Sequence, residues 1–336
     1  MASGQEFTLA QLAATSTANK SVRRAELMTR IAGFGRCADA ASHVGVFLTI
    51  TCPSRFHRFT TVNGGKAVVA NGNYDSQETP RTGQHYLARL WTHIRSELAR
   101  CAIQTCGFRI AEPQHDGTPH WHLLLFAAAD QVEALVEVMK KHALKDSPDE
   151  AGAAQHRCDV KMIDRSRGSA AGYIAKYVAK NIDGEHVGND FNGKPATETA
   201  RRVDAWATTW RIRQFQQIGG PPVNVWRELR RIPSLPLGAP KHLQEAHQAV
   251  NKLTQRTGQE AASVAWDGYC QAQGGCSVAV RPASSWRCVP WRAWPDTATS
   301  LATDSWAHWK HRSALLWLHD GYTARNSSET FCKNAT

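Results

Sequence analysis

The chain has 336 residues, and its 42% hydrophobic and 21% charged content is typical of a folded globular protein rather than a disordered one. No stretch approaches the ~20 apolar residues of a membrane span, and the N-terminus lacks the apolar core of a signal peptide, so we expect a cytoplasmic protein without a membrane partner. The net charge of +11 favours a phosphate backbone as partner, although excess lysine and arginine can also serve solubility alone.

The nine cysteines are not spaced like those of a zinc ribbon or zinc finger, because no two of them form a Cys-x-x-Cys pair. Their number is odd, and a cytoplasmic location is expected, so we interpret them as reduced thiols.

The first half of the chain predicts alternating helices and strands. In residues 1–40, a predicted helical segment, the helix from Ser21 is expected to end near Gly33 and Gly35. The elements expected next are a strand over 44–51, a polar surface loop over 63–81, an amphipathic helix over 84–101, and strands over 108–113 and 120–126.

Asp116-Gly117 lies between the last two of these strands and predicts a hairpin turn. A helix capped by Asp130, a strand over 158–163 and a helix over 172–181 follow. Strands and helices that alternate around a central hairpin favour an α+β fold, in which helices cover an antiparallel sheet.

Beyond this region the sequence predicts a C-terminal helical extension. Basic helices are expected over 199–217 and 223–231, followed by a proline-rich linker over 232–240 and a short helix over 242–258. We therefore expect four parts: a helical segment 1–40, a main domain 41–231 with the basic extension, a linker with a short helical segment 232–283, and an irregular, tryptophan-rich tail 284–336.

A His-Trp-His segment lies in the predicted strand over 120–126. Side chains two residues apart in a strand share a face, so His120 and His122 point the same way, as two imidazole ligands of a divalent metal would. An isolated pair of strand histidines is more often structural. A zinc hydrolase of the His-x-His-x-Asp kind is disfavoured, because Leu124 occupies the acidic position.

Glu112 ends the preceding strand, and folding the hairpin returns its carboxylate to the two histidines. Two imidazoles and one carboxylate with open positions suit Mg²⁺ or Mn²⁺, because substrate phosphate oxygens can complete the coordination.

The predicted helix over 172–181 carries Tyr173 and Tyr177 one turn apart on one face, with Lys176 and Lys180 on an adjacent stripe. Two tyrosines at a helix–sheet boundary can be purely structural. Cationic neighbours, however, favour the phenolate form and bind phosphate. Combined with a metal, a tyrosine could attack a phosphodiester and retain the 5′ phosphate as an ester.

This combination resembles the two-tyrosine branch of the HUH endonuclease superfamily and, more closely, the bacteriophage replication gene A protein family. The similarity covers roughly residues 20–260 and is carried by segments 47–57, 108–126, 172–181 and 212–222.

The resemblance implies an HUH-type antiparallel sheet and an enzyme that nicks single-stranded DNA at a replication origin. It also implies a 5′-phosphotyrosyl link and a free 3′ hydroxyl, with a host helicase and polymerase as partners. Glu112, His120 and His122 would be the metal ligands. Tyr173 and Tyr177 would be the nucleophiles, and Lys176 would position phosphate or activate a phenol.

Further residues are candidates for DNA binding, since charges suit phosphates and rings suit bases. They are Arg55, His57, Lys180, Arg211 and Arg213, the last two in a stretch where arginines alternate with Trp206, Trp210, Phe215 and Trp226. The alternative is that these aromatic side chains belong to the core and the arginines to a solvated face.

Two other functions stay open from the sequence. One is a remnant of such an initiator that binds DNA without cutting it, and the other is a transposase or relaxase of the same superfamily.

Overall fold

The computed structural model describes residues 8–62, 67–185, 188, 195–251 and 259–276 of the chain. The predicted tail 284–336 lies outside these residues. Of the described helices, none has the length and apolar character needed to cross a membrane.

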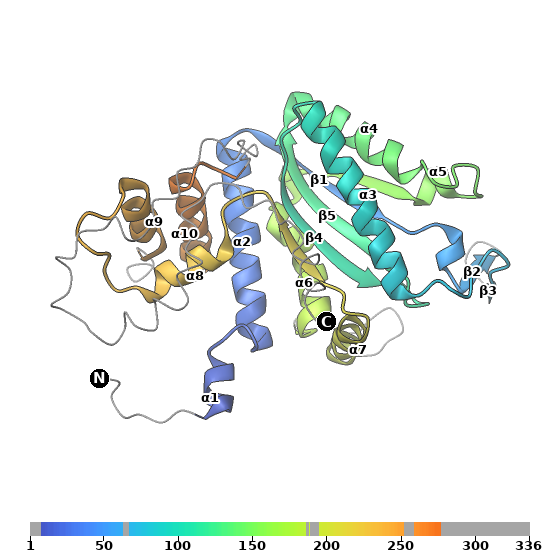
Figure 1. Cartoon of the computed structure of the whole chain (residues 1–336), viewed down its shortest axis with the longest axis horizontal. Helices are drawn as coiled ribbons and strands as arrows, with labels where there is room; N and C mark the ends of the chain where they lie inside the picture. Colours follow the sequence, from blue (N-terminus) through green and yellow to red (C-terminus); the bar gives the residue numbers. More distant parts are fainter. Residues whose placement is uncertain (1–7, 63–66, 186–187, 189–194, 252–258, 277–336) are drawn as a thin grey trace, which may run out of the picture.

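A five-stranded antiparallel sheet forms the centre of the molecule, in the order β6-β1-β5-β4-β7 (Figure 1). Its strands are β1 (His43–Ile50), β4 (Cys106–Pro113), β5 (Pro119–Ala128), β6 (Cys158–Met162) and β7 (Phe215–Ile218). A separate two-stranded ribbon consists of β2 (Phe59–Val62) and β3 (Ala67–Ala70).

Ten α-helices are described, with three short 3-10 turns at Ser54–Phe56, Ala129–Gln131 and Arg165–Arg167. The helices are α1 (Leu9–Ala14), α2 (Lys20–Ala40), α3 (Pro80–Arg100), α4 (Val132–Ala143), α5 (Ala153–His156), α6 (Ala170–Ile182), α7 (Ala196–Thr209), α8 (Val223–Arg231), α9 (Lys241–Asn251) and α10 (Gln259–Ala272). The fold is therefore α+β, as the sequence predicts.

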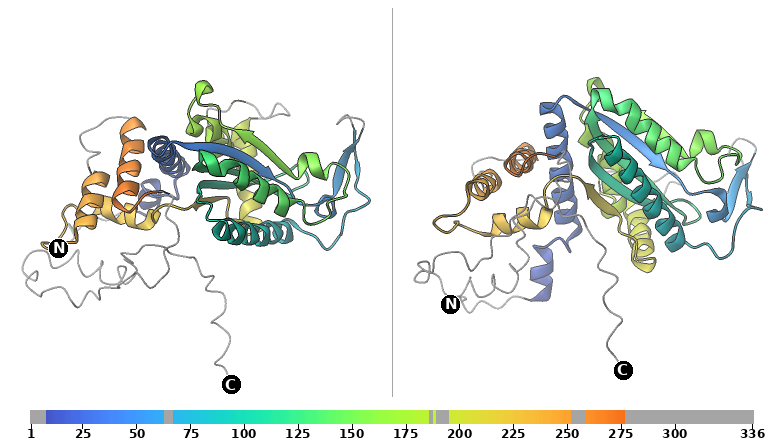
Figure 2. Two further views of the ribbon diagram at one scale, coloured as in Figure 1. Left: turned by 90° about the horizontal axis from the view of Figure 1, so that it is seen from above. Right: turned by 45° about the horizontal axis from the view of Figure 1, so that its top comes forward.

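Both faces of the sheet are buried, because β5 alternates its apolar side chains between two cores. Leu124 and Phe126 enter the core formed with α2 and α6, whereas Leu123 and Leu125 enter the core formed with α3 and α4. The two cores hold the sheet between helical layers (Figures 1 and 2).

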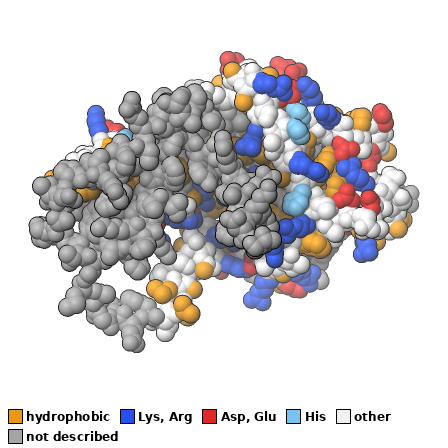
Figure 3. Space-filling view, viewed as in Figure 1, with side chains coloured by type: hydrophobic (Ala, Val, Ile, Leu, Met, Phe, Trp, Pro, Cys, Tyr) orange, Lys and Arg blue, Asp and Glu red, His pale blue; other side chains and the backbone are white. Residues whose placement is uncertain are grey.

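Helix α10 lies against α2, on its side away from the sheet, and α9 packs on α10 and α8 (Figures 1 and 2). Trp226 of α8 and Trp266 of α10 are buried there with Phe34 of α2. On the opposite side of the molecule, α3 and α4 carry both basic and acidic side chains on their outer surface (Figure 3).

The N-terminal half differs from the sequence prediction in three places. Helix α2 continues through Gly33 and Gly35 to Ala40, because Trp266 packs directly on the side-chain-free surface of Gly33. The predicted loop over 63–81 contains β3 and the start of α3 at Pro80, which Thr79 caps. Asp130 lies in a 3-10 turn and the helix itself begins at Val132.

The predicted helix over 199–217 is two elements. Helix α7 ends at Thr209, Arg211 adopts a left-handed conformation with φ 52°, and Phe215–Ile218 then pairs with β4 as an edge strand. The short helix predicted over 242–258 corresponds to α9, described over Lys241–Asn251, while residues 252–258 lie outside the described residues. Helix α10 is a further helix that the sequence did not predict.

We expect Gly33→Ala to destabilise the protein by about 1–3 kcal/mol, because a Cβ atom there would lie 2.6 Å from Cδ1 of Trp266. Gly35→Ala is the matched control in the same helix. A Cβ atom at Gly35 would have no atom within 4 Å. Because alanine has the better helix propensity, Gly35→Ala should raise the free energy of unfolding by at most about 1 kcal/mol. Urea unfolding of both variants measures the difference, and equal effects would contradict the close contact between α2 and α10.

Candidate active site

The hairpin of β4 and β5 brings Glu112 directly opposite His120, and Ile110 opposite His122. The ligand atoms of Glu112, His120 and His122 all lie within 4.8 Å of one another. Nε2 of His122 is 3.4 Å from Oε2 of Glu112, and Nε2 of His120 is 3.9 Å from the same oxygen. The structure therefore brings the three predicted metal ligands together on the sheet face that α6 covers.

Neighbouring side chains fix the orientation of two of these ligands. Oγ1 of Thr49, on β1, lies 3.0 Å from Nδ1 of His122 and leaves Nε2 facing Glu112. Nδ2 of Asn181, on α6, donates to Oε1 of Glu112 and to the backbone oxygen of Tyr177, which leaves Oε2 of Glu112 facing the imidazoles. Such partners hold metal ligands in position in known metal sites.

The electrostatics of the cluster suit a divalent cation. Burial alone would raise the pKa of Glu112, but the hydrogen bond from His122 and the charges of His122, Lys180 and His120 outweigh it and lower the pKa to about 2. Burial and the neighbouring His122 lower the pKa of His120 to about 4. At neutral pH the cluster presents a carboxylate and a neutral imidazole, which are the protonation states that bind metal.

Two further observations fit a metal at this place. Nδ1 of His120 is buried without a hydrogen-bond partner among the described residues. Nζ of Lys180 lies 3.7 Å from Oε2 of Glu112, while the lysine side chain remains 46% exposed. The predicted DNA-binding residue Lys180 therefore lies at the exposed edge of the cluster.

Helix α6 positions the two tyrosines over β1 and β5. Ser169 caps the helix, and Ile174 and Val178 anchor it in the core. The Tyr177 ring lies 4.6 Å from the His122 ring, measured between centroids, and the exposed Tyr173 ring lies 5.0 Å from that of Phe47.

Tyr177 is not activated by its lysine neighbour in this structure. Burial and the nearby Tyr173 and Glu112 raise the pKa of Tyr177 above its ordinary value. Nζ of Lys176 lies over the Tyr177 ring, 5.2 Å from its centroid. Of the two roles that the resemblance implies for Lys176, this position favours phosphate binding over deprotonation of the phenol.

Arg55 and His57 are bonded to internal partners. The Arg55 guanidinium pairs with Asp146, at 2.8 and 3.2 Å. His57 bonds to Asp116 in the hairpin turn at 3.0 Å and to the backbone oxygen of Cys52 at 3.3 Å. Both side chains therefore hold the loop after β1 in place.

Arg211 and Arg213 line a cavity of about 560 Å³ between α2, α7, α8 and the start of β7. Three more arginines line it, namely Arg23, Arg30 and Arg227. The cavity adjoins the cluster through Gln214, whose side chain donates to the backbone oxygen of Asn181 at 3.5 Å.

Burial lowers the pKa of Arg30 to about 10, so it stays charged at neutral pH, and its Nε is buried without a partner among the described residues. Glu26 offsets part of this charge, because it accepts two hydrogen bonds of 2.7 Å from Arg227. The Arg23 guanidinium lies 5.5 Å from the centroid of the Phe215 ring. The cavity therefore combines positive charge with an aromatic ring.

Sequence reasoning missed the roles of Asn181 and Thr49. Asn181 continues the one-face spacing of Tyr173 and Tyr177 by another four residues, which was an available signal. The position of Thr49 opposite His122 depends on the pairing of β1 with β5, which no local pattern indicates.

The fold and this geometry define an α+β protein whose sheet carries a carboxylate–histidine cluster beside a two-tyrosine helix. The chain belongs to the bacteriophage replication gene A protein family, whose model matches residues 2–185. This confirms the resemblance to that family found in the sequence.

Several curated relatives are similar to the chain. The replication gene A protein of Escherichia phage P2 is 38% identical over 286 residues, which are 82% of this chain and 36% of that protein. The replication protein of Haemophilus phage HP1 is 40% identical over 266 residues (77% and 31%). A probable replication endonuclease from a prophage-like region of Salmonella typhimurium is 34% identical over 233 residues (68% and 28%).

The chain thus spans about a third of the length of the curated relatives it matches. No solved structure matches it significantly.

We expect Asn181→Leu to weaken Mn²⁺ binding about 10–100-fold, because Glu112 loses the amide that orients it. Isothermal titration of the protein with Mn²⁺ measures the change. Asn251→Leu is a control in which an asparagine of a different helix, α9, is replaced, and it should leave Mn²⁺ affinity unchanged. Unaltered affinity in Asn181→Leu would remove Asn181 from the site.

Proposed function

We propose that the protein is an HUH-type endonuclease that nicks one DNA strand through a tyrosine and so initiates rolling-circle replication of a phage or prophage genome. The observation that carries this proposal is the contact of Tyr177 with His122, whose Nε2 faces Glu112. A nucleophile and a metal-type cluster thus adjoin each other on the sheet. The names of the relatives, replication proteins and probable replication endonucleases, support the same function.

In the proposed reaction the phenolic oxygen of Tyr177 attacks the scissile phosphorus, and the bond between phosphorus and the 3′ oxygen breaks. The phenol loses its proton and the 3′ oxygen gains one, so the products are a 5′-phosphotyrosine and a free 3′ hydroxyl. Mg²⁺ or Mn²⁺ held by Glu112, His120 and His122 would polarise the phosphate and stabilise charge on the departing oxygen.

The residues around the tyrosines have separate proposed roles. Lys176 and Lys180 are exposed on α6 and would hold the phosphate against the cluster by charge. Tyr173, which is 37% exposed and contacts the same Phe47 ring as Tyr177, would attack in a second cleavage while Tyr177 still holds DNA. A host polymerase would extend the 3′ hydroxyl, and a host helicase would separate the strands.

Single-stranded DNA would pass from the tyrosine helix into the arginine cavity. Gln214 lies between the two places, and the five arginines supply charge for phosphates while Phe215 offers a ring on which a base can stack. Arg211 and Arg213 would therefore contact DNA, whereas Arg55 and His57 would act by holding the loop after β1.

The nicking proposal predicts a covalent adduct. With Mn²⁺ and single-stranded fragments tiled across the genome that encodes the chain, a protein–DNA species that survives denaturing electrophoresis should form. Tyr173→Phe/Tyr177→Phe should abolish it, whereas Tyr74→Phe, which lies away from the cluster and bonds to Glu78, should form it normally.

An adduct in the double tyrosine variant would disprove the assigned nucleophiles. DNA binding without any adduct would favour the non-cutting remnant instead. Transfer through a single tyrosine to a second site would favour a transposase or relaxase.

The DNA path predicts a change in salt dependence. In Arg211→Ala/Arg213→Ala, the slope of log Kd against log salt for a single-stranded oligonucleotide should fall by about 1.4, since each lost phosphate contact removes about 0.7. Fluorescence anisotropy in the absence of metal measures binding without cleavage. Arg95→Ala, on the outer surface of α3, is the control and should keep the wild-type slope. An equal decrease of the slope in Arg95→Ala would show that the effect arises from net charge alone.

A further inference from the structure

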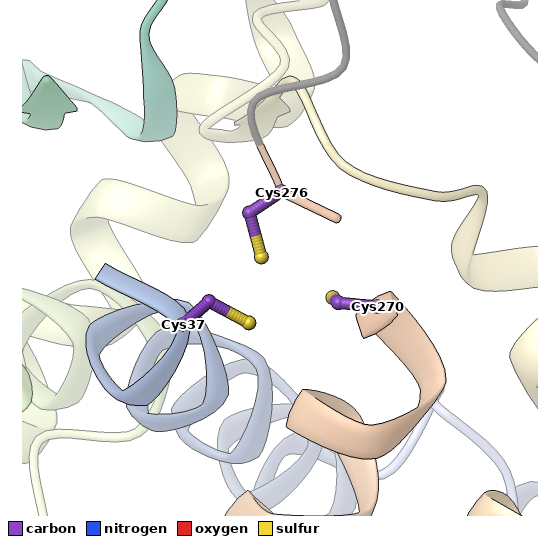
Figure 4. A group of neighbouring side chains, drawn as sticks. All are labelled: Cys37, Cys270 and Cys276. Carbon is purple, nitrogen blue, oxygen red and sulfur yellow. The ribbon is translucent and has the colours of Figure 1, made fainter. Parts of the chain in front are cut away.

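Three cysteines far apart in the sequence meet at the junction of α2 and α10 (Figure 4). Cys37 lies on α2, Cys270 in the last turn of α10, and Cys276 in the segment that follows. Their Sγ atoms all lie within 4.8 Å of one another and point into one common space. Cys270 and Cys276 are buried, and Cys37 is half-buried, so the cluster is largely shielded from solvent.

The backbone around the cluster is tightly held. Gly274 and Gly275 have φ values of 95° and 102°, which turn the chain back after α10. The backbone amide of Gly275 donates to the backbone oxygen of Cys270 at 2.7 Å. The backbone amide of Gly220 donates to the backbone oxygen of Cys276 at 2.9 Å. The turn after α10 therefore brings Cys276 back to Cys270 and Cys37.

A fourth donor is available from the sheet. Cys106, the first residue of β4, is buried and adjoins Cys276, since a Cβ atom at Gly219 would lie 3.0 Å from Cβ of Cys106 and 3.0 Å from the backbone oxygen of Cys276. On the other side, Sγ of Cys37 donates to Oδ1 of Asp267 at 3.0 Å. Asp267 lies one turn before Cys270 on the same helix, so its carboxylate also borders the cluster.

We propose that Cys37, Cys270 and Cys276, completed by Cys106, bind a structural Zn²⁺ ion. Zinc takes four thiolates at about 2.3 Å in a tetrahedron, which sets neighbouring sulfurs about 3.8 Å apart. The Sγ atoms of Cys37, Cys270 and Cys276 lie within 4.8 Å of one another, so closure needs each of these three sulfurs to move by no more than about 1 Å toward the centre.

Thiolates are soft ligands that select zinc over the hard ions Mg²⁺ and Mn²⁺. The cluster is therefore chemically distinct from the one formed by Glu112, His120 and His122. The four thiols lose their protons on binding, and no oxidant or reductant is required. The bound ion would join α2, α10 and the first residue of β4, and so attach the C-terminal helices to the sheet.

The test is the zinc content of the full chain, purified under reducing conditions and passed through metal-free buffer. Mass spectrometry of the metal should find about one zinc per chain in the wild type and about none in Cys37→Ser or Cys270→Ser. Cys101→Ser, an exposed thiol at the end of α3, and Glu112→Gln should both retain zinc. Retention of zinc by Cys270→Ser, or its loss from Glu112→Gln, would overturn the proposal.

Replacement by Co²⁺ provides a measurement that does not depend on a variant that folds. The wild-type protein should show the near-ultraviolet sulfur-to-cobalt absorption of a thiolate site, and zinc should abolish it. Absence of both zinc and this absorption from the wild type would refute the site. For the fourth ligand, Cys106→Ser should weaken zinc retention against a chelator, whereas Asp267→Asn should not. The reverse result would overturn the assignment of Cys106.

Discussion

The antiparallel pairing of β4 with β5 is the constraint on which the candidate active site depends. It sets Glu112 opposite His120 and places His122 on the same face. A register slip of one residue in β5 would turn both imidazoles to the sheet face that α3 and α4 cover. It would also move each leucine of the strand from its own core to the core on the opposite face. Because β5 is buried on both faces, the packing that stabilises the fold also holds the register of the site.

Helix α6 completes the site through side chains spaced four residues apart. Tyr177 contacts the His122 ring, and Asn181 bonds to Glu112 one turn later. Ile174 and Val178 are buried in the core and hold α6 in this position against the sheet. The buried carboxylate of Glu112 is stable as an anion because the imidazole of His122 lies 3.4 Å from it and the amide of Asn181 donates a hydrogen bond to it.

Helix α2 connects the regions that the proposals assign to chemistry, DNA binding and metal-based cross-linking. Arg24 pairs with Asp183 at the end of α6 at 2.8 Å, and Arg30 lines the arginine cavity. One turn before its C-terminus, α2 contributes Cys37 to the thiol cluster. Helix α2 packs on the sheet and on α10. It therefore couples the position of the C-terminal helices to the sheet face that carries the candidate active site.

The sequence by itself determined the hairpin, the shared face of His120 and His122, the return of Glu112 and the tyrosine pair. The histidines are two residues apart in a strand, the tyrosines are four apart in a helix, and the Asp116-Gly117 turn sets the hairpin, so local backbone geometry is sufficient to predict these features. Only the tertiary structure decided that α2 continues past Gly33 and that Phe215–Ile218 joins the sheet as an edge strand, since each depends on a partner distant in the sequence. The same reason applies to Thr49, which lies opposite His122 through the pairing of β1 with β5, and to the cysteines. Spacing argued against a zinc ribbon or finger, whereas the fold brings Cys37 to Cys270 across more than two hundred residues, a proximity that no local pattern encodes.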